Sequence, residues 1–121
     1  PINVFKGAVK GNKVYIGEDL VYEAEEVISS DEKPVWIAIR PEGFAPAQKG
    51  DKCVLHAESD MIQVLGRDIS IVAKNPHCTK PTFKAIISQE DMTNDVHLSL
   101  RVKNNKIFLF DYETEERIHT K

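Results

Sequence analysis

Four residues of this sequence are of the types that hold a zinc ion. Cys53 and His56 stand in the stretch CVLH, and His77 is followed directly by Cys78. Thiolate and imidazole groups are common zinc ligands, and four of them complete a tetrahedral site. On the strand predicted for this stretch, however, Cys53 and His56 differ by an odd number of positions and point to opposite faces. The adjacent pair also lacks the spacing of a chelating motif, so we predict no metal site here.

The carboxylates and the remaining histidines form no evident catalytic set. Asp60, Asp68 and Asp91 could supply a pair for acid–base chemistry, but their spacing brings no two of them together. In a chain with 19 acidic residues, such separate carboxylates are expected on the solvated surface. His97 and His119 have no identifiable partner in the sequence, and we assign them no role.

The local motifs that build nucleotide sites and hydrolytic sites are missing as well. The sequence contains no GxxxxGK(S/T) phosphate loop, no GxGxxG, no GxSxG and no HExxH. We therefore predict that these residues are not an enzyme, contain no catalytic residues, and bind no cofactor, ATP included.

The charge balance argues against a nucleic-acid partner. The formal net charge is −3, whereas domains that bind nucleic acid usually carry a basic surplus that displaces counterions from phosphates. Single-strand binding also needs stacking aromatic residues on a basic groove. Only 7% of the residues are aromatic, and we expect most of them at core-facing strand positions.

The compartment follows from the cysteines and from the hydropathy. The two cysteines are expected to be reduced thiols of a cytoplasmic protein. No apolar run approaches the roughly 20 residues that a membrane-spanning helix needs. No signal peptide is visible either, because no basic N-terminal segment precedes an apolar one.

Short runs of β-branched and aromatic residues, separated by Gly, Pro, Asn and Asp, dominate the 121 residues. This pattern is typical of an all-β protein with roughly eight to ten short antiparallel strands and little helix. Because a barrel removes exposed strand edges, we predict a closed or nearly closed barrel in a single domain. The predicted strands span residues 4–9, 13–16, 20–25, 35–40, 53–57, 61–65, 69–73, 83–87, 96–102 and 106–110.

The strand at 35–40 is the clearest of these. Residues 29–33 before it read as a polar loop, and Pro34 and Pro41 are predicted to mark its ends, since proline cannot donate to a sheet ladder. Trp36 and Ala38 make its second face as apolar as its first, which predicts a central strand that is covered on both sides.

Three segments of the chain occur together in a recognisable order. They are IRPE at 39–42, MIQVLGRDISIVAK at 61–74 and IFLFDYETEERI at 107–118. Together they resemble the C-terminal regulatory domain of the ATP-binding subunits of ABC importers, most closely the maltose-type branch that imports carbohydrate. The opening PINVF is similar to the junction at which the ATPase domain of that family ends. In that family the domain is an oligomer-binding-fold-like (OB) β-barrel, called the transport-associated OB domain.

The resemblance carries over to seven residues, and it implies structural roles for them. We expect Pro41 to end the strand ladder, and the charged residues on either side of it to brace the corner by hydrogen bonds or pairing. In the family, a glycine usually follows a few residues after the closing Phe-Asp pair, here Phe110 and Asp111, and makes the final turn. Glu115 takes the place of that glycine in this sequence. Because glycine favours a positive φ and glutamate does not, we expect this turn to differ in shape. The seven residues are Arg40, Pro41, Glu42, Leu65, Gly66, Phe110 and Asp111.

The family resemblance also implies a function. Residues 1–121 would be a single regulatory domain that lacks its N-terminal ATPase domain, and that missing domain would bind ATP and magnesium and couple hydrolysis to sugar uptake. The partners implied are a twin subunit, the membrane subunits of the transporter and a regulatory protein. The location implied is cytoplasmic, peripheral on the inner face of the cell membrane. The Ser-Ala-Arg-Asn motif of oxyanion-binding relatives is absent, which argues against molybdate.

One alternative stays open at this point. A free-standing OB-type module that binds single-stranded nucleic acid would have the same fold. The acidic balance and the few aromatic residues count against it.

Overall fold

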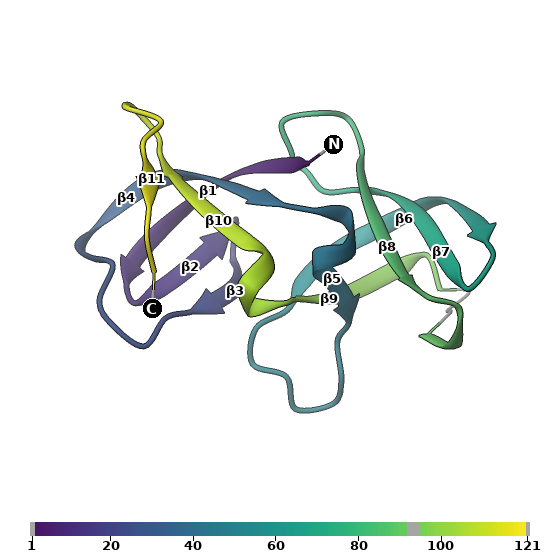
Figure 1. Cartoon of the computed structure of the whole chain (residues 1–121). Helices are drawn as coiled ribbons and strands as arrows, with labels where there is room; N and C mark the ends of the chain where they lie inside the picture. Colours follow the sequence, from purple (N-terminus) through teal and green to yellow (C-terminus); the bar gives the residue numbers. More distant parts are fainter. Residues whose placement is uncertain (1, 92–94, 121) are drawn as a thin grey trace.

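The computed structural model describes residues 2–91 and 95–120, which form two antiparallel sheets (Figure 1). The larger sheet has the strand order β11-β10-β4-β1-β2-β3. Its strands are β1 (Asn3–Gly11), β2 (Lys13–Ile16), β3 (Asp19–Glu23), β4 (Ser29–Ile39), β10 (Ile107–Asp111) and β11 (Arg117–Ile118).

The smaller sheet has the strand order β5-β9-β6-β7-β8. Its strands are β5 (Phe44–Pro46), β6 (Leu55–Leu65), β7 (Asp68–Lys74), β8 (Phe83–Ser88) and β9 (His97–Val102). The helical content of the described chain is confined to three short 3-10 turns, η1 (Pro41–Gly43), η2 (Gln89–Asp91) and η3 (Asn104–Lys106). No helix in the described parts of the chain is long and apolar enough to cross a membrane.

Residues of both sheets share one apolar core. Three aromatic rings join them: the ring of Phe83 in β8 lies 5.1 Å from that of Phe5 in β1 and 5.4 Å from that of Phe44 in β5. Each of these rings is almost fully buried. The larger sheet therefore has an inner face turned to this core and an outer face turned away from it.

The prediction of an all-β, antiparallel, barrel-like domain is confirmed, with eleven strands in the described residues. The predicted closure of the barrel is not found, because the two sheets of the described chain do not join into one continuous ladder. Main-chain hydrogen bonds tie them together at the seams instead. Val54 N donates to Leu20 O at 3.0 Å, and Lys6 N donates to His77 O at 2.9 Å.

The prediction of a polar loop at 29–33 is wrong, because these residues form the first half of β4. Pro34 consequently lies inside the strand, opposite Ala8 of β1, and not at its end. Proline fits here because the side of β4 opposite to β1 is unpaired at this position. Strand β10 reaches only as far as Val35, so this half of β4 has β1 as its one neighbour. Proline is tolerated at such an edge, where one side of the strand needs no donor.

The strands predicted at 53–57 and 61–65 are a single strand, β6, with a β-bulge between Ser59 and Met61. A bulge adds one unpaired residue, and beyond it the side chains point to the opposite faces. Because the alternation of apolar residues is interrupted there, the sequence pattern predicted two separate strands. Cys53 precedes this strand. The argument from opposite strand faces therefore does not apply to Cys53 and His56.

Candidate functional site

The corner that carries IRPE is held by its main chain. Gly43 N donates to Arg40 O at 2.8 Å, and Lys103 N donates to Gly43 O at 2.8 Å. Pro41 is buried, while the side chains of Arg40 and Glu42 are exposed and make no hydrogen bond or ion pair with the described residues. The expectation that these two charged side chains brace the corner is therefore wrong, because they are turned to solvent and main-chain hydrogen bonds hold the corner instead.

The second family segment lies at the tip of the β6–β7 hairpin. Leu65 is the last residue of β6 and is 49% exposed, and Gly66 has a φ of 66°. This φ favours glycine, so the turn predicted at this position is confirmed. Met61 and Val64 are also exposed on the same strand. The tip thus exposes three apolar side chains to solvent.

The third segment forms the final turn, residues 111–116, between β10 and β11. Asp111 Oδ1 accepts hydrogen bonds from Thr114 N at 3.0 Å and Glu113 N at 2.9 Å. These two bonds, with a smaller contribution from Lys33, hold the pKa of Asp111 below its ordinary value. The Lys33 Nζ lies 3.5 Å from Asp111 Oδ2. The side chain of Asp111 therefore organises the turn that follows it.

Glu115 adopts the left-handed backbone conformation itself, with a φ of 61°. It is the one described residue other than glycine with a positive φ. Its N donates to Asp111 O at 2.9 Å, which closes the turn around it. The expectation that glutamate would change the shape of this turn is therefore wrong, because the turn imposes on Glu115 the conformation that glycine favours.

The residues that sequence reasoning missed lie on the outer face of the larger sheet. Because side chains alternate along β4, Trp36 points to the face opposite the buried Val35. Strand register places Trp36 opposite Lys6 of β1 on one side and opposite Phe110 of β10 on the other. Phe110 in turn faces Arg117 of β11. Four neighbouring strands thus line up two aromatic and two basic side chains.

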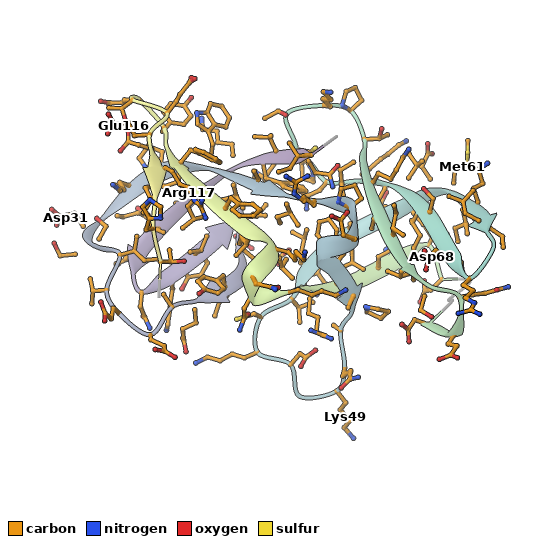
Figure 2. The ribbon with its side chains drawn as sticks, in the orientation of Figure 1. Asp31, Lys49, Met61, Asp68, Glu116 and Arg117 are labelled. Carbon is orange, nitrogen blue, oxygen red and sulfur yellow. The ribbon has the colours of Figure 1, made fainter. Side chains whose placement is uncertain are left out.

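Further ring contacts extend this surface. The rings of Trp36 and Tyr112 are stacked, with centroids 4.7 Å apart and an interplanar angle of 22°. Lys6 Nζ lies 5.0 Å from the centroid of Tyr112, and Arg117 Cζ lies 5.0 Å from that of Phe108. Both distances are within the range of cation–π attraction. The β10–β11 hairpin that carries Glu116 and Arg117 borders this face (Figures 1 and 2).

A groove of about 450 Å³ opens on this face. We call it the aromatic groove, and its lining residues are Val4, Trp36, Thr79, Phe110 and Glu115. It is wide open to solvent, unlike the enclosed pockets that bury most of a ligand's surface. The groove brings together strands β1, β4 and β10, the loop after β7, and the final turn. Of the family residues, it contains only Phe110.

The prediction that most aromatic residues face the core is wrong. Phe5, Phe44 and Phe83 are buried, but four others lie half-exposed on the outer face. The sequence does carry a signal for this, since Phe108 and Phe110 alternate with core residues along β10. The second face of β4 is covered only in part, since Ala38 is buried whereas Trp36 is half-buried. The outer aromatic residues are Trp36, Phe108, Phe110 and Tyr112.

A second pocket, of about 490 Å³, lies beside the start of β6. His56 Nδ1 and Asp19 Oδ1 are 2.9 Å apart, and His56 N donates to Asp19 Oδ2 at 2.8 Å. His97, to which the sequence assigned no role, lines the same pocket and lies opposite Glu58 in the β6–β9 ladder. A histidine oriented by a carboxylate can move a proton, but no nucleophile among the described residues is hydrogen-bonded to it.

The other candidates from the sequence are only partly brought together. Asp60 pairs with Lys74 Nζ at 3.4 Å. Asp68 and Asp91 line the same pocket near the IRPE corner, so the expectation that no two of these carboxylates come together is wrong. Cys53 and Cys78 are free thiols. His119 is exposed near the chain end. In the part of the chain that the structure describes, no group of three or more His, Cys, Asp or Glu side chains could hold a metal ion.

No protein-family model and no curated protein matches this chain.

Proposed function

We propose that this chain is the regulatory, dimer-supporting domain of the ATP-binding subunit of an ABC importer for carbohydrate. The observation that carries the proposal is the φ of 61° at Glu115. In the family that the chain resembles, a glycine stands at this position, and glycine is favoured where φ is positive. The final turn of this chain thus has the backbone conformation for which the family pattern calls, although its residue differs. The antiparallel all-β fold is consistent with the same family.

In this proposal the domain tunes transport and does not power it. Two copies would contact each other across a two-fold axis and hold two ATPase domains near one another. This raises the effective concentration of the ATPase domains without adding to the hydrolytic site. The parent subunit would lie on the inner face of the cell membrane, bound to the membrane subunits of the transporter. A regulatory protein would act through surfaces of this domain.

Two measurements test the proposal. The first is the sequence encoded before Pro1, which must contain a phosphate-binding loop. The second is the ATPase rate of the parent as a function of protein concentration, with and without residues 1–121. Deletion should leave hydrolysis at high protein concentration, shift its onset to higher concentration and remove regulatory responses. An upstream sequence without the phosphate loop, or a deletion that changes neither property, would refute the proposal.

The outer aromatic face favours one second candidate, a module that binds single-stranded nucleic acid. Trp36, Phe110 and Tyr112 offer rings on which bases can stack, and Lys6 and Arg117 supply positive charge beside them. Against this candidate stands the acidic final turn, which repels phosphates.

Fluorescence anisotropy with a labelled oligothymidylate of about 20 nucleotides, longer than one OB-fold site, decides between the two. Tight binding at physiological salt that weakens steeply as salt rises would favour the nucleic-acid module. A Trp36→Leu substitution should then abolish it. Absence of binding would leave the importer proposal as the better account.

A further inference from the structure

The lining of the aromatic groove is mostly apolar and includes one charged residue. The lining residues are Val4, Trp36 and Phe110, together with Thr79 and Glu115. One face of the Trp36 ring is covered by Tyr112. Ring faces carry partial negative charge, and they attract cations that come within about 6 Å of the ring centroid. A carboxylate in the lining adds to the same negative potential.

Lys6 and Arg117 stand opposite Trp36 and Phe110 in the strand ladders, but their charged ends lie over other rings. Lys33 pairs with Asp111, and Lys6 and Arg117 lie over aromatic rings outside the set of lining residues. The side chain of Glu115 has no cationic partner among the described residues. The protein thus already places two of its own cations over rings of this face, while the set of residues that line the groove includes no cation.

We propose that the aromatic groove binds a small organic cation, of the quaternary ammonium or alkylammonium class. The cation would lie against Trp36 and Phe110, with the carboxylate of Glu115 as its counter-charge. Quaternary ammonium groups are recognised in this way because methyl groups bury apolar surface while the charge interacts with the ring faces. An anionic ligand is disfavoured, since the groove has no lining cation. The inference does not rest on the proposed function.

The experiment is a titration of the isotope-labelled 121-residue chain, followed by backbone amide chemical shifts. The probe is choline, and the matched control is 3,3-dimethylbutan-1-ol, which has the same shape without the charge. We expect choline to give saturable shifts confined to the groove and the final turn, with a Kd in the millimolar range for so few atoms. The neutral alcohol should bind at least about fivefold more weakly, since the cation–π attraction is lost.

A pair of isosteric variants tests the role of the carboxylate. Glu115→Gln should weaken choline binding about fivefold or more. Glu116→Gln removes the same charge from an adjacent exposed residue that does not line the groove, and it should change the Kd by less than about twofold. Neither change deletes a hydrogen bond or ion pair made by the altered side chain, so both variants should fold.

Several results would overturn the inference. One is equal binding of choline and the alcohol, which would mean that the groove recognises only apolar shape. A second is an equal effect of the two substitutions, which would mean that only the general charge of the hairpin matters. A third is shifts that remain linear up to about 100 mM choline, or that fall elsewhere on the surface, because a Kd in the millimolar range would saturate before that.

Discussion

Replacing Glu115 by glycine should make this protein more stable, although glycine usually destabilises a fold. A residue with a Cβ in the left-handed conformation costs about 1–2 kcal/mol, and this cost vanishes in the variant. The additional freedom of glycine in the unfolded chain costs about 0.5–1 kcal/mol. The difference predicts that Glu115→Gly raises the free energy of unfolding by about 0.5–1 kcal/mol.

The structure allows this subtraction because little else changes at the site. Glu115 is exposed, and its side chain makes no hydrogen bond or ion pair with described residues. The bond from its backbone N to Asp111 O at 2.9 Å survives in the variant. The bonds that Asp111 Oδ1 accepts from the turn survive as well. The substitution therefore isolates the backbone conformation.

The assay is urea denaturation at neutral pH, supported by thermal unfolding. A gain of this size should raise Tm by about 2–5 °C in a domain of this length.

Glu116→Gly is the matched control, since Glu116 lies next in the turn without a positive φ. It should lower stability by about 0.5–1 kcal/mol. Glu115→Ala should be nearly neutral, because it keeps the strained φ. If Glu115→Gly destabilises the protein as much as Glu116→Gly does, the reasoning from the turn is wrong.

Three further outcomes follow from other parts of the fold. Gly7→Ala should destabilise the protein by about 1–3 kcal/mol in urea titrations, because its Cβ would collide with the main chain of β2 and the side chain of Ile37; wild-type stability would contradict the packing described. The lowered pKa of Asp111 means that its stabilising contribution is present above the unfolded-state pKa and is lost as pH falls through the folded-state pKa. The stability difference between wild type and Asp111→Asn should therefore shrink below about pH 4, and a difference independent of pH would refute this assignment. Burial raises the pKa of the Cys53 thiol. In a Cys78→Ser variant, Cys53 is the one remaining thiol, and it should react with a thiol reagent at pH 8 more slowly than free cysteine does.

Most of the strands could be predicted from the sequence, because local pattern and turn chemistry determine them. The predicted strand at 13–16 matches β2, and the turn at Gly66 has the positive φ that its residue favours. The strand predictions fail where pairing with a strand that is distant in the sequence determines the structure. Residues 29–33 are polar, yet they pair with β1 through Lys33 and Ser29. No local signal shows that a polar segment has such a partner, nor that a bulge joins two runs into β6.

The sequence by itself determined that the chain is an antiparallel β-protein, whereas the positive φ at Glu115 became visible only in the folded turn. It could not determine which apolar face is covered. Alternation along β4 makes both faces apolar, and only the tertiary structure shows that Val35 faces the core while Trp36 lies on the outer face. The aromatic groove likewise unites residues from three strands, a loop and a turn. Its existence depends on strand order and register, and these follow from the packing of the whole core, not from any segment alone.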